Sequence, residues 1–154
     1  MTLYEESSRL FRELDSRQLP YALCGGLAMA VHGFPRATMD IDLLVASTAL
    51  NDMRALAVEL GYIENPRPLP LDKGRIVLHR FVKVERSDYV VLDVILASDA
   101  LPDLMTSRLR LPTDFGGVWV LSRSALARMK SLRNSGVDQE DIKRLREEPF
   151  DHED

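Results

Sequence analysis

Apolar and polar residues alternate with a helical period in some parts of the chain and with a strand period in others. Between residues 3 and 14, Leu and Phe recur at helical spacing among charged residues, which predicts an amphipathic helix that ends before Pro20. The same spacing, with glycine or proline at the ends, predicts further helices at 27–32, about 48–60, 99–108, 122–133 and 138–148.

Short apolar runs bounded by turn residues predict the strands 21–24, 41–46, 75–84, 89–97 and 118–121. The polar turn at residues 85–88 favours an antiparallel hairpin of the third and fourth strands. The proline-rich segment 62–74 is predicted to be an irregular surface loop. Together these elements predict an α/β fold, with a mixed, twisted sheet of about five strands flanked by helices.

Length and composition are those of one globular domain. The chain has 154 residues, 45% apolar and 29% charged, which predicts a single domain. The predicted elements divide this domain into a core at 20–121 and a C-terminal helical hairpin at 122–148. We expect no membrane partner, because no apolar run is long enough to span a bilayer. The single cysteine, Cys24, excludes an internal disulfide and favours a cytoplasmic location. A net charge of −4 gives no overall nucleic-acid footprint.

Two carboxylates stand close together at the start of a predicted strand. Asp40 and Asp42 are two residues apart, so their side chains point to the same face. Adjacent acids repel unless a cation lies between them, and Mg²⁺ binds one or two protein carboxylates together with phosphate oxygens. An acid pair that faces solvent at the edge of a strand is the alternative.

A third acid, Asp93, interrupts the apolar run 90–96. A buried carboxylate without a partner costs several kcal/mol, so Asp93 must face a cation, a group of donors or a site. An internal salt bridge to an arginine is one such solution. If its strand lies beside that of Asp42, three acids converge, as two metals ~4 Å apart require.

Gly25 and Gly26 stand between a predicted strand and a predicted helix. Glycine lets a phosphate approach the backbone, and the first turn of a helix has N–H groups that no helical carbonyl satisfies. A Gly-Gly pair alone is most often a turn. Followed by the acid pair, it indicates phosphoryl or nucleotidyl transfer.

The order Cys24-Gly25-Gly26, Asp40-Ile41-Asp42 and a later Asp93 resembles the signature of the polymerase β-like nucleotidyltransferase superfamily. The resemblance implies the nucleotidyltransferase fold, with Gly25 and Gly26 holding the triphosphate and Asp40, Asp42 and Asp93 holding Mg²⁺. Many members have Ser where Gly26 stands, so backbone N–H groups would have to replace that hydroxyl contact.

The residues Arg36-x-Thr38-x-Asp40, Lys130 and Asp141 are similar to those of a bacterial abortive-infection toxin-type (AbiEii-like) branch. By this resemblance Lys130 would neutralise phosphate charge, and Asp141 would help to place it. Arg36 lies in the loop that leads into the acid pair, where it could contact phosphate. Taken alone, Lys130 also suits a solvated helix face, and Asp141 suits the first turn of a helix, where it answers the dipole.

The resemblance implies an Mg²⁺-dependent transferase that moves a nucleoside monophosphate from an NTP such as ATP to a hydroxyl of tRNA or protein. It further implies a toxin of a toxin–antitoxin pair, with a cognate antitoxin or a second copy of the chain as partner. Two alternatives stay open. One is a non-catalytic nucleotide-binding or antitoxin domain, and the other is an enzyme with a small-molecule acceptor such as an antibiotic.

Overall fold

The computed structural model describes residues 1–34, 37–71, 74, 76–97, 103–132 and 142–146. Residues 142–146 are helical. The other elements, in chain order, are α1 (Leu3–Ser16), β1 (Ala22–Cys24), α2 (Gly25–Val31), β2 (Asp40–Ala46), η1 (Ser47–Ala49), α3 (Leu50–Glu59), β3 (Ile63–Glu64), β4 (Leu69–Leu71), β5 (Ile76–Glu85), β6 (Asp88–Ala97), η3 (Met105–Ser107), β7 (Leu109–Thr113), β8 (Gly116–Val120) and α4 (Arg123–Ser131).

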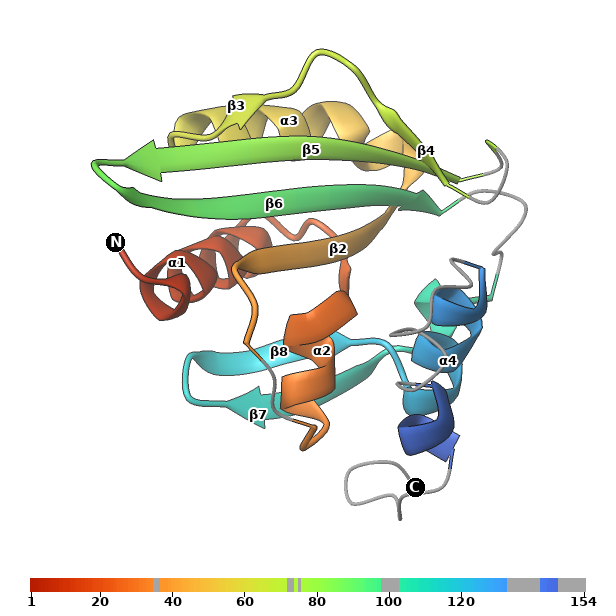
Figure 1. Ribbon diagram of the computed structural model, residues 1–154. Coiled ribbons are helices and arrows are strands. Elements are labelled where there is room, and N and C mark those ends of the chain that lie inside the picture. The colour runs from red at the N-terminus through yellow and green to blue at the C-terminus, as the bar shows by residue number, and fades with distance from the viewer. Residues whose placement is uncertain (35–36, 72–73, 75, 98–102, 133–141, 147–154) are drawn as a thin grey trace.

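The strands form one mixed sheet, as predicted (Figure 1). Its order is β3-β5-β6-β2-β1-β8-β7, with β4 also paired to β5. β2 is central, antiparallel to β1 and parallel to β6, and β5 and β6 form the predicted antiparallel hairpin. The α/β fold class is therefore confirmed.

The sheet has eight strands, more than the approximately five expected. The additional ones, β3, β4 and β7, are short and lie outside the central strands. β3 and β4 fall in the proline-rich segment predicted to be irregular, and β7 contains Pro112. Edge positions tolerate proline and need no apolar alternation, so the pattern that identifies central strands does not identify them.

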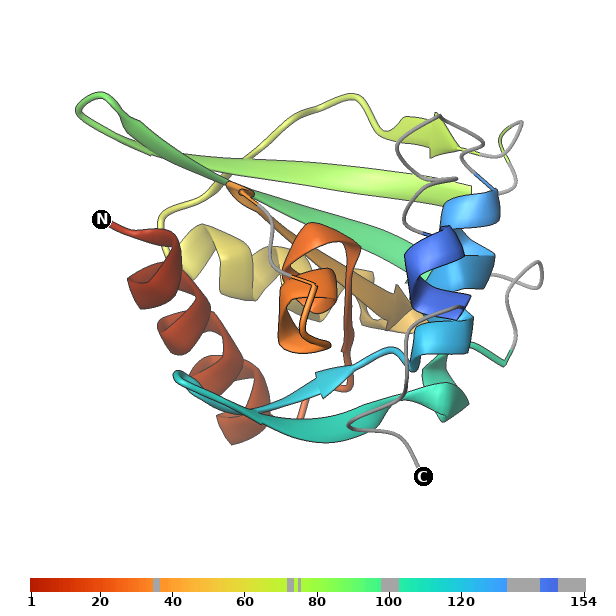
Figure 2. The same ribbon diagram turned by 60° about the horizontal axis from the view of Figure 1, so that its bottom comes forward.

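The two faces of the sheet are covered differently (Figures 1 and 2). α1 packs on one face, where Glu6 accepts hydrogen bonds from Tyr62 and from Lys83 of β5. Figure 1 shows α3 behind β5, on the same side as α1. α2 lies on the other face, because its first residue, Gly25, meets Asp42 of β2. That second face carries the candidate site.

Helix ends are fixed by local hydrogen bonds. The Thr2 side chain caps α1 by accepting from the Glu5 N–H, and Ser122 caps α4 by accepting from the Ala125 N–H. α1 ends with a Leu19 N–H to Leu14 carbonyl bond, and Gln18 there has φ +54°. This αL position is usually a glycine, so Gln18 is held there at a conformational cost.

The predicted helix 99–108 is wrong over its described part, which contains only the short 3₁₀ turn η3 before β7. The helix 122–133 is confirmed as α4, and its buried Arg123 donates to the carbonyl of Leu145 in the helix 142–146. In the described part of the chain, no helix is long and apolar enough to cross a membrane.

Candidate active site

The parallel pairing of β2 with β6 brings the acids together. Asp42 lies directly beside Asp93, and Asp40 lies beside Val91. Residues opposite each other on adjacent strands share a face, and residues two apart on one strand share it too. The three carboxylates therefore lie on the same face of two neighbouring strands. The sequence predicted this convergence for the case in which the strand of Asp93 lies beside that of Asp42, as it does.

Asp93 is buried, with 2% of its surface exposed, and it is held by an arginine. Arg80 of β5 donates two hydrogen bonds to it, Nε to Oδ1 at 2.8 Å and Nη2 to Oδ2 at 3.0 Å. This two-pronged geometry is the strong form of an arginine–carboxylate pair. The salt bridge to an arginine that was considered for Asp93 is therefore present. It forms beside Asp42, so Asp93 has an arginine partner and also lies next to the other acids.

Arg80 serves all three acids electrostatically. Its pKa is raised, first by the hydrogen bonds to Asp93 and then by the charges of Asp93, Asp40 and Asp42, which outweigh burial. One guanidinium thus offsets part of the repulsion that three neighbouring carboxylates would otherwise create. Sequence reasoning did not single out Arg80. The predicted hairpin contained the signal, because a turn that pairs Glu85 with Asp88 also pairs Arg80 with Asp93.

Gly25 makes room for Asp42. Its φ is +70°, and a Cβ built on it would lie 2.1 Å from Asp42 Oδ2 and 2.7 Å from Asp42 Cγ. No side chain fits at either distance, so the Asp42 carboxylate is seated against bare backbone at the point where β1 becomes α2. The glycine is therefore required for the position of Asp42, in addition to the phosphate contact that the sequence predicts for it.

The start of β2 is fixed by two side chains. The Thr38 hydroxyl accepts from the Asp40 N–H at 3.1 Å, a local turn that aligns the strand before its first carboxylate. Cys24, which lies beside Asp42, donates its Sγ–H to the Asp42 carbonyl at 3.4 Å. The backbone that carries Asp40 and Asp42 is thus held from both sides.

Asp40 and Asp42 suit a divalent cation in chemistry and placement. Both are half-buried carboxylates on one face, and Mg²⁺ prefers such oxygen ligands together with waters and phosphates. Both Asp93 oxygens accept from Arg80. Among the described residues, no three His, Cys, Asp or Glu side chains gather closely enough to hold one ion. Each Asp93 oxygen accepts one hydrogen bond from Arg80 and keeps a second lone pair, so the metal role of all three acids stays a prediction.

Four predicted site residues lie outside the group of three carboxylates and Gly25. Lys130 lies on α4 and is buried, which is unlike the solvated helix face considered for it. Gly26 lies in the first turn of α2. Arg36 and Asp141 lie outside the described residues. The roles of all four stay predictions.

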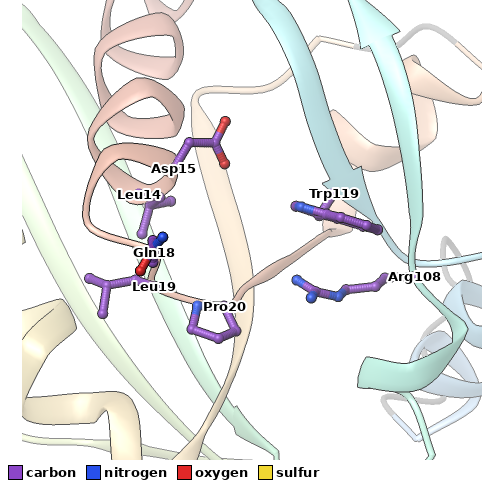
Figure 3. A pocket seen from close by; sticks show the side chains of 7 residues that line it. All are labelled: Leu14, Asp15, Gln18, Leu19, Pro20, Arg108 and Trp119. Carbon is purple, nitrogen blue, oxygen red and sulfur yellow. The ribbon is translucent and has the colours of Figure 1, made fainter.

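A small pocket lies away from the carboxylates (Figure 3). It is lined by the end of α1, Pro20, Arg108 and Trp119, with the Arg108 guanidinium 4.2 Å from the Trp119 ring centre. Pro20 precedes β1 and Gly25 follows it, so the pocket and the acids lie at opposite ends of that strand. At about 220 Å³ it is smaller than most ligand sites, which span roughly 300–1,000 Å³. It does not alter the choice of the carboxylates as the candidate site.

Comparison with solved structures identifies the architecture. The lincosamide antibiotic adenylyltransferase LnuA, solved with lincomycin bound, superposes with a TM-score of 0.62 at 17% identity, over 93% of this chain and 96% of that one. The chain has the nucleotidyltransferase fold. A Thermotoga maritima protein provisionally assigned as a nucleotidyltransferase gives 0.62 at 16% identity over 91% of both chains.

ANT(2'')-Ia in complex with adenylyl-2''-tobramycin shares the nucleotidyltransferase fold as well. It gives a TM-score of 0.59 at 16% identity, over 91% of this chain and 87% of that one. No family model matches the sequence, and no curated protein sequence matches it. The fold predicted from the glycine and aspartate motifs is therefore confirmed by three-dimensional similarity.

Proposed function

We propose that this chain is an Mg²⁺-dependent nucleotidyltransferase. The observation that carries the proposal is the alignment of Asp42 with Asp93 on adjacent parallel strands, with Asp40 on the same face and Gly25 packed against Asp42. Carboxylates beside a strand-to-helix turn with bare backbone suit a metal and a triphosphate together.

In the proposed reaction, the hydroxyl oxygen of the acceptor bonds to the α-phosphorus of an NTP. The bond between that phosphorus and the α–β bridging oxygen breaks, and pyrophosphate leaves with the electron pair. Asp40 and Asp42 would hold Mg²⁺, which supplies positive charge against the phosphate oxygens. Asp93, positioned by Arg80, would accept the proton of the hydroxyl. Gly25, Gly26 and Lys130 would bind the triphosphate.

For the acceptor, structural likeness favours a small molecule. LnuA is a lincosamide antibiotic adenylyltransferase and is matched over nearly the whole of both chains, and ANT(2'')-Ia was solved in complex with adenylyl-2''-tobramycin. Transfer to tRNA or protein in a toxin–antitoxin pair, as the motif resemblance implies, is the second candidate. A non-catalytic nucleotide-binding domain is the third, and the presence of all three acids opposes it.

Label transfer tests the reaction. The protein would be incubated with each of the four α-³²P-labelled NTPs, Mg²⁺, and separate pools of lincosamides, aminoglycosides, total tRNA and total cell protein. Asp42→Asn should abolish transfer and Mn²⁺ binding measured by electron paramagnetic resonance, because it removes a charged oxygen ligand. Asp52→Asn, at an exposed position on α3, is the matched control. Transfer that persists in Asp42→Asn would refute the proposal.

A further inference from the structure

The site face of the sheet is built from rows of side chains that run across β2, β6, β5 and β3. The register of these strands assigns each residue to a row. In order along the strands, the rows are Leu44–Ile95–Leu78, then Asp42–Asp93–Arg80, then Asp40–Val91–Val82–Ile63, and finally Tyr89–Val84.

One side of the charged row is closed. Leu44, Ile95 and Leu78 are 0%, 6% and 7% exposed, so other parts of the chain cover this row. A substrate therefore cannot extend from the carboxylates in this direction along the sheet.

The other side of the charged row is apolar and partly open, because Val82 and Val91 beside that row are half-buried. We call Ile63, Val82, Val84, Tyr89 and Val91 the apolar strip. Ile63 is 77% exposed, Val84 68% and Tyr89 49%, and these three are half of the six large apolar side chains exposed in the described part of the chain. Exposed apolar residues that gather on one surface, rather than lying scattered, mark a binding surface.

The geometry of the rows connects the strip to the carboxylates. Successive rows are two residues apart, or about 7 Å. A molecule whose hydroxyl oxygen lies beside Asp93 therefore reaches Val91 and Val82 within about 7 Å, and Val84 and Tyr89 within about 14 Å. The glycines lie beyond β2 on the β1 side, so a nucleotide bound there leaves the strip uncovered.

We propose that the apolar strip is the acceptor subsite, and that the acceptor is a small hydroxyl-bearing molecule with an apolar face. This inference rests on the proposed nucleotidyl transfer. The strip has no charged member. Arg80, in the next row, is hydrogen-bonded to Asp93, and Lys83 points to the opposite face, toward Glu6. A nucleic-acid backbone needs cations, and the strip offers none, which favours a small molecule over a nucleic acid.

Methyl NMR tests the strip with a defined probe. Octyl glucoside below its micelle concentration has hydroxyls and an apolar chain, and glucose has the hydroxyls alone. With Mg²⁺ and a non-transferable ATP analogue present, octyl glucoside should shift the methyl signals of Ile63, Val82, Val84 and Val91, and glucose should not. Val84→Lys should weaken this binding at least fivefold. Val58→Lys, at a 59% exposed position on α3, should leave it unchanged.

Several results would overturn the inference. These are no methyl shifts in the strip, equal shifts at Val58, or unchanged binding in Val84→Lys. Sedimentation that shows a dimer broken by Val84→Lys would assign the strip to a second copy instead. Binding of Mg-ATP, measured separately by calorimetry, tests the proposed function itself. If Mg-ATP binds and the strip fails, only the subsite is refuted, and if Mg-ATP does not bind, the proposed function is refuted.

Discussion

Replacing Arg80 by Gln should destabilise the protein because it leaves Asp93 buried without its cation. The Asp93 side chain is only 3% exposed, while the Arg80 side chain is 38% exposed. Breaking a fully buried ion pair costs about 3–5 kcal/mol. Water that reaches the exposed side of Arg80 lowers this, so we expect a loss of about 2–3 kcal/mol in the free energy of unfolding.

The measurement is urea denaturation in EDTA, and the matched control is Arg54→Gln. Arg54 makes the same two-pronged contact with Glu64, at 2.6 and 3.2 Å, but the Glu64 side chain is 23% exposed. Its loss should cost less than about 1 kcal/mol. Equal losses for the two variants would refute the reasoning, because the difference between them isolates the burial of the carboxylate.

Magnesium should show whether Arg80 competes with a metal ion, in addition to holding Asp93 in place. In Arg80→Gln the three carboxylates lose a competing cation, so Mg²⁺ should stabilise this variant more than the wild type. The comparison is the shift of the urea midpoint between EDTA and Mg²⁺. A larger shift in the wild type would show that Arg80 does not compete with metal for Asp93.

Three further predictions follow from single contacts. Gly25→Ala should unfold more readily than Gly33→Ala and should lose Mn²⁺ binding, because the new methyl group collides with Asp42. Gly33 is the control, since its φ of +93° is similar and a Cβ added there would meet no atom within 4 Å. Equal losses of stability in the two variants would contradict this. Burial raises the pKa of Tyr21 to about 12, so as the pH rises the unfolded state loses the phenol proton before the folded state does. The free energy of unfolding should therefore fall above pH 10, by about 1.4 kcal/mol per pH unit up to pH 12. Tyr21→Phe should flatten this slope in urea titrations. Gln18→Gly should raise stability by up to about 1 kcal/mol by relieving the αL backbone at the end of α1, and an unchanged urea midpoint would contradict this.

Much of the site could be read from the sequence, because its signals are local. The two-residue spacing of Asp40 and Asp42 determines that they share a face, whatever the rest of the fold does. A carboxylate within an apolar run, as at Asp93, determines that a partner must exist. Gly25-Gly26 between a strand and a helix marks a close backbone approach. These features identified the fold class and its central acids.

The tertiary structure decided what depends on register between strands. Periodicity within one strand says which residues share a face, but it does not say which residue of another strand lies opposite. The pairing of β2 with β6 placed Asp42 beside Asp93, whereas the pair of Arg80 and Asp93 follows from the hairpin turn that the sequence predicts. Register also aligned Ile63, Val82 and Val91 into the apolar strip, although Ile63 falls in a segment that the sequence predicts to be irregular. The order of strands in the sheet comes from backbone pairing and packing between segments far apart in the chain, so the apolar pattern of a single strand does not determine it.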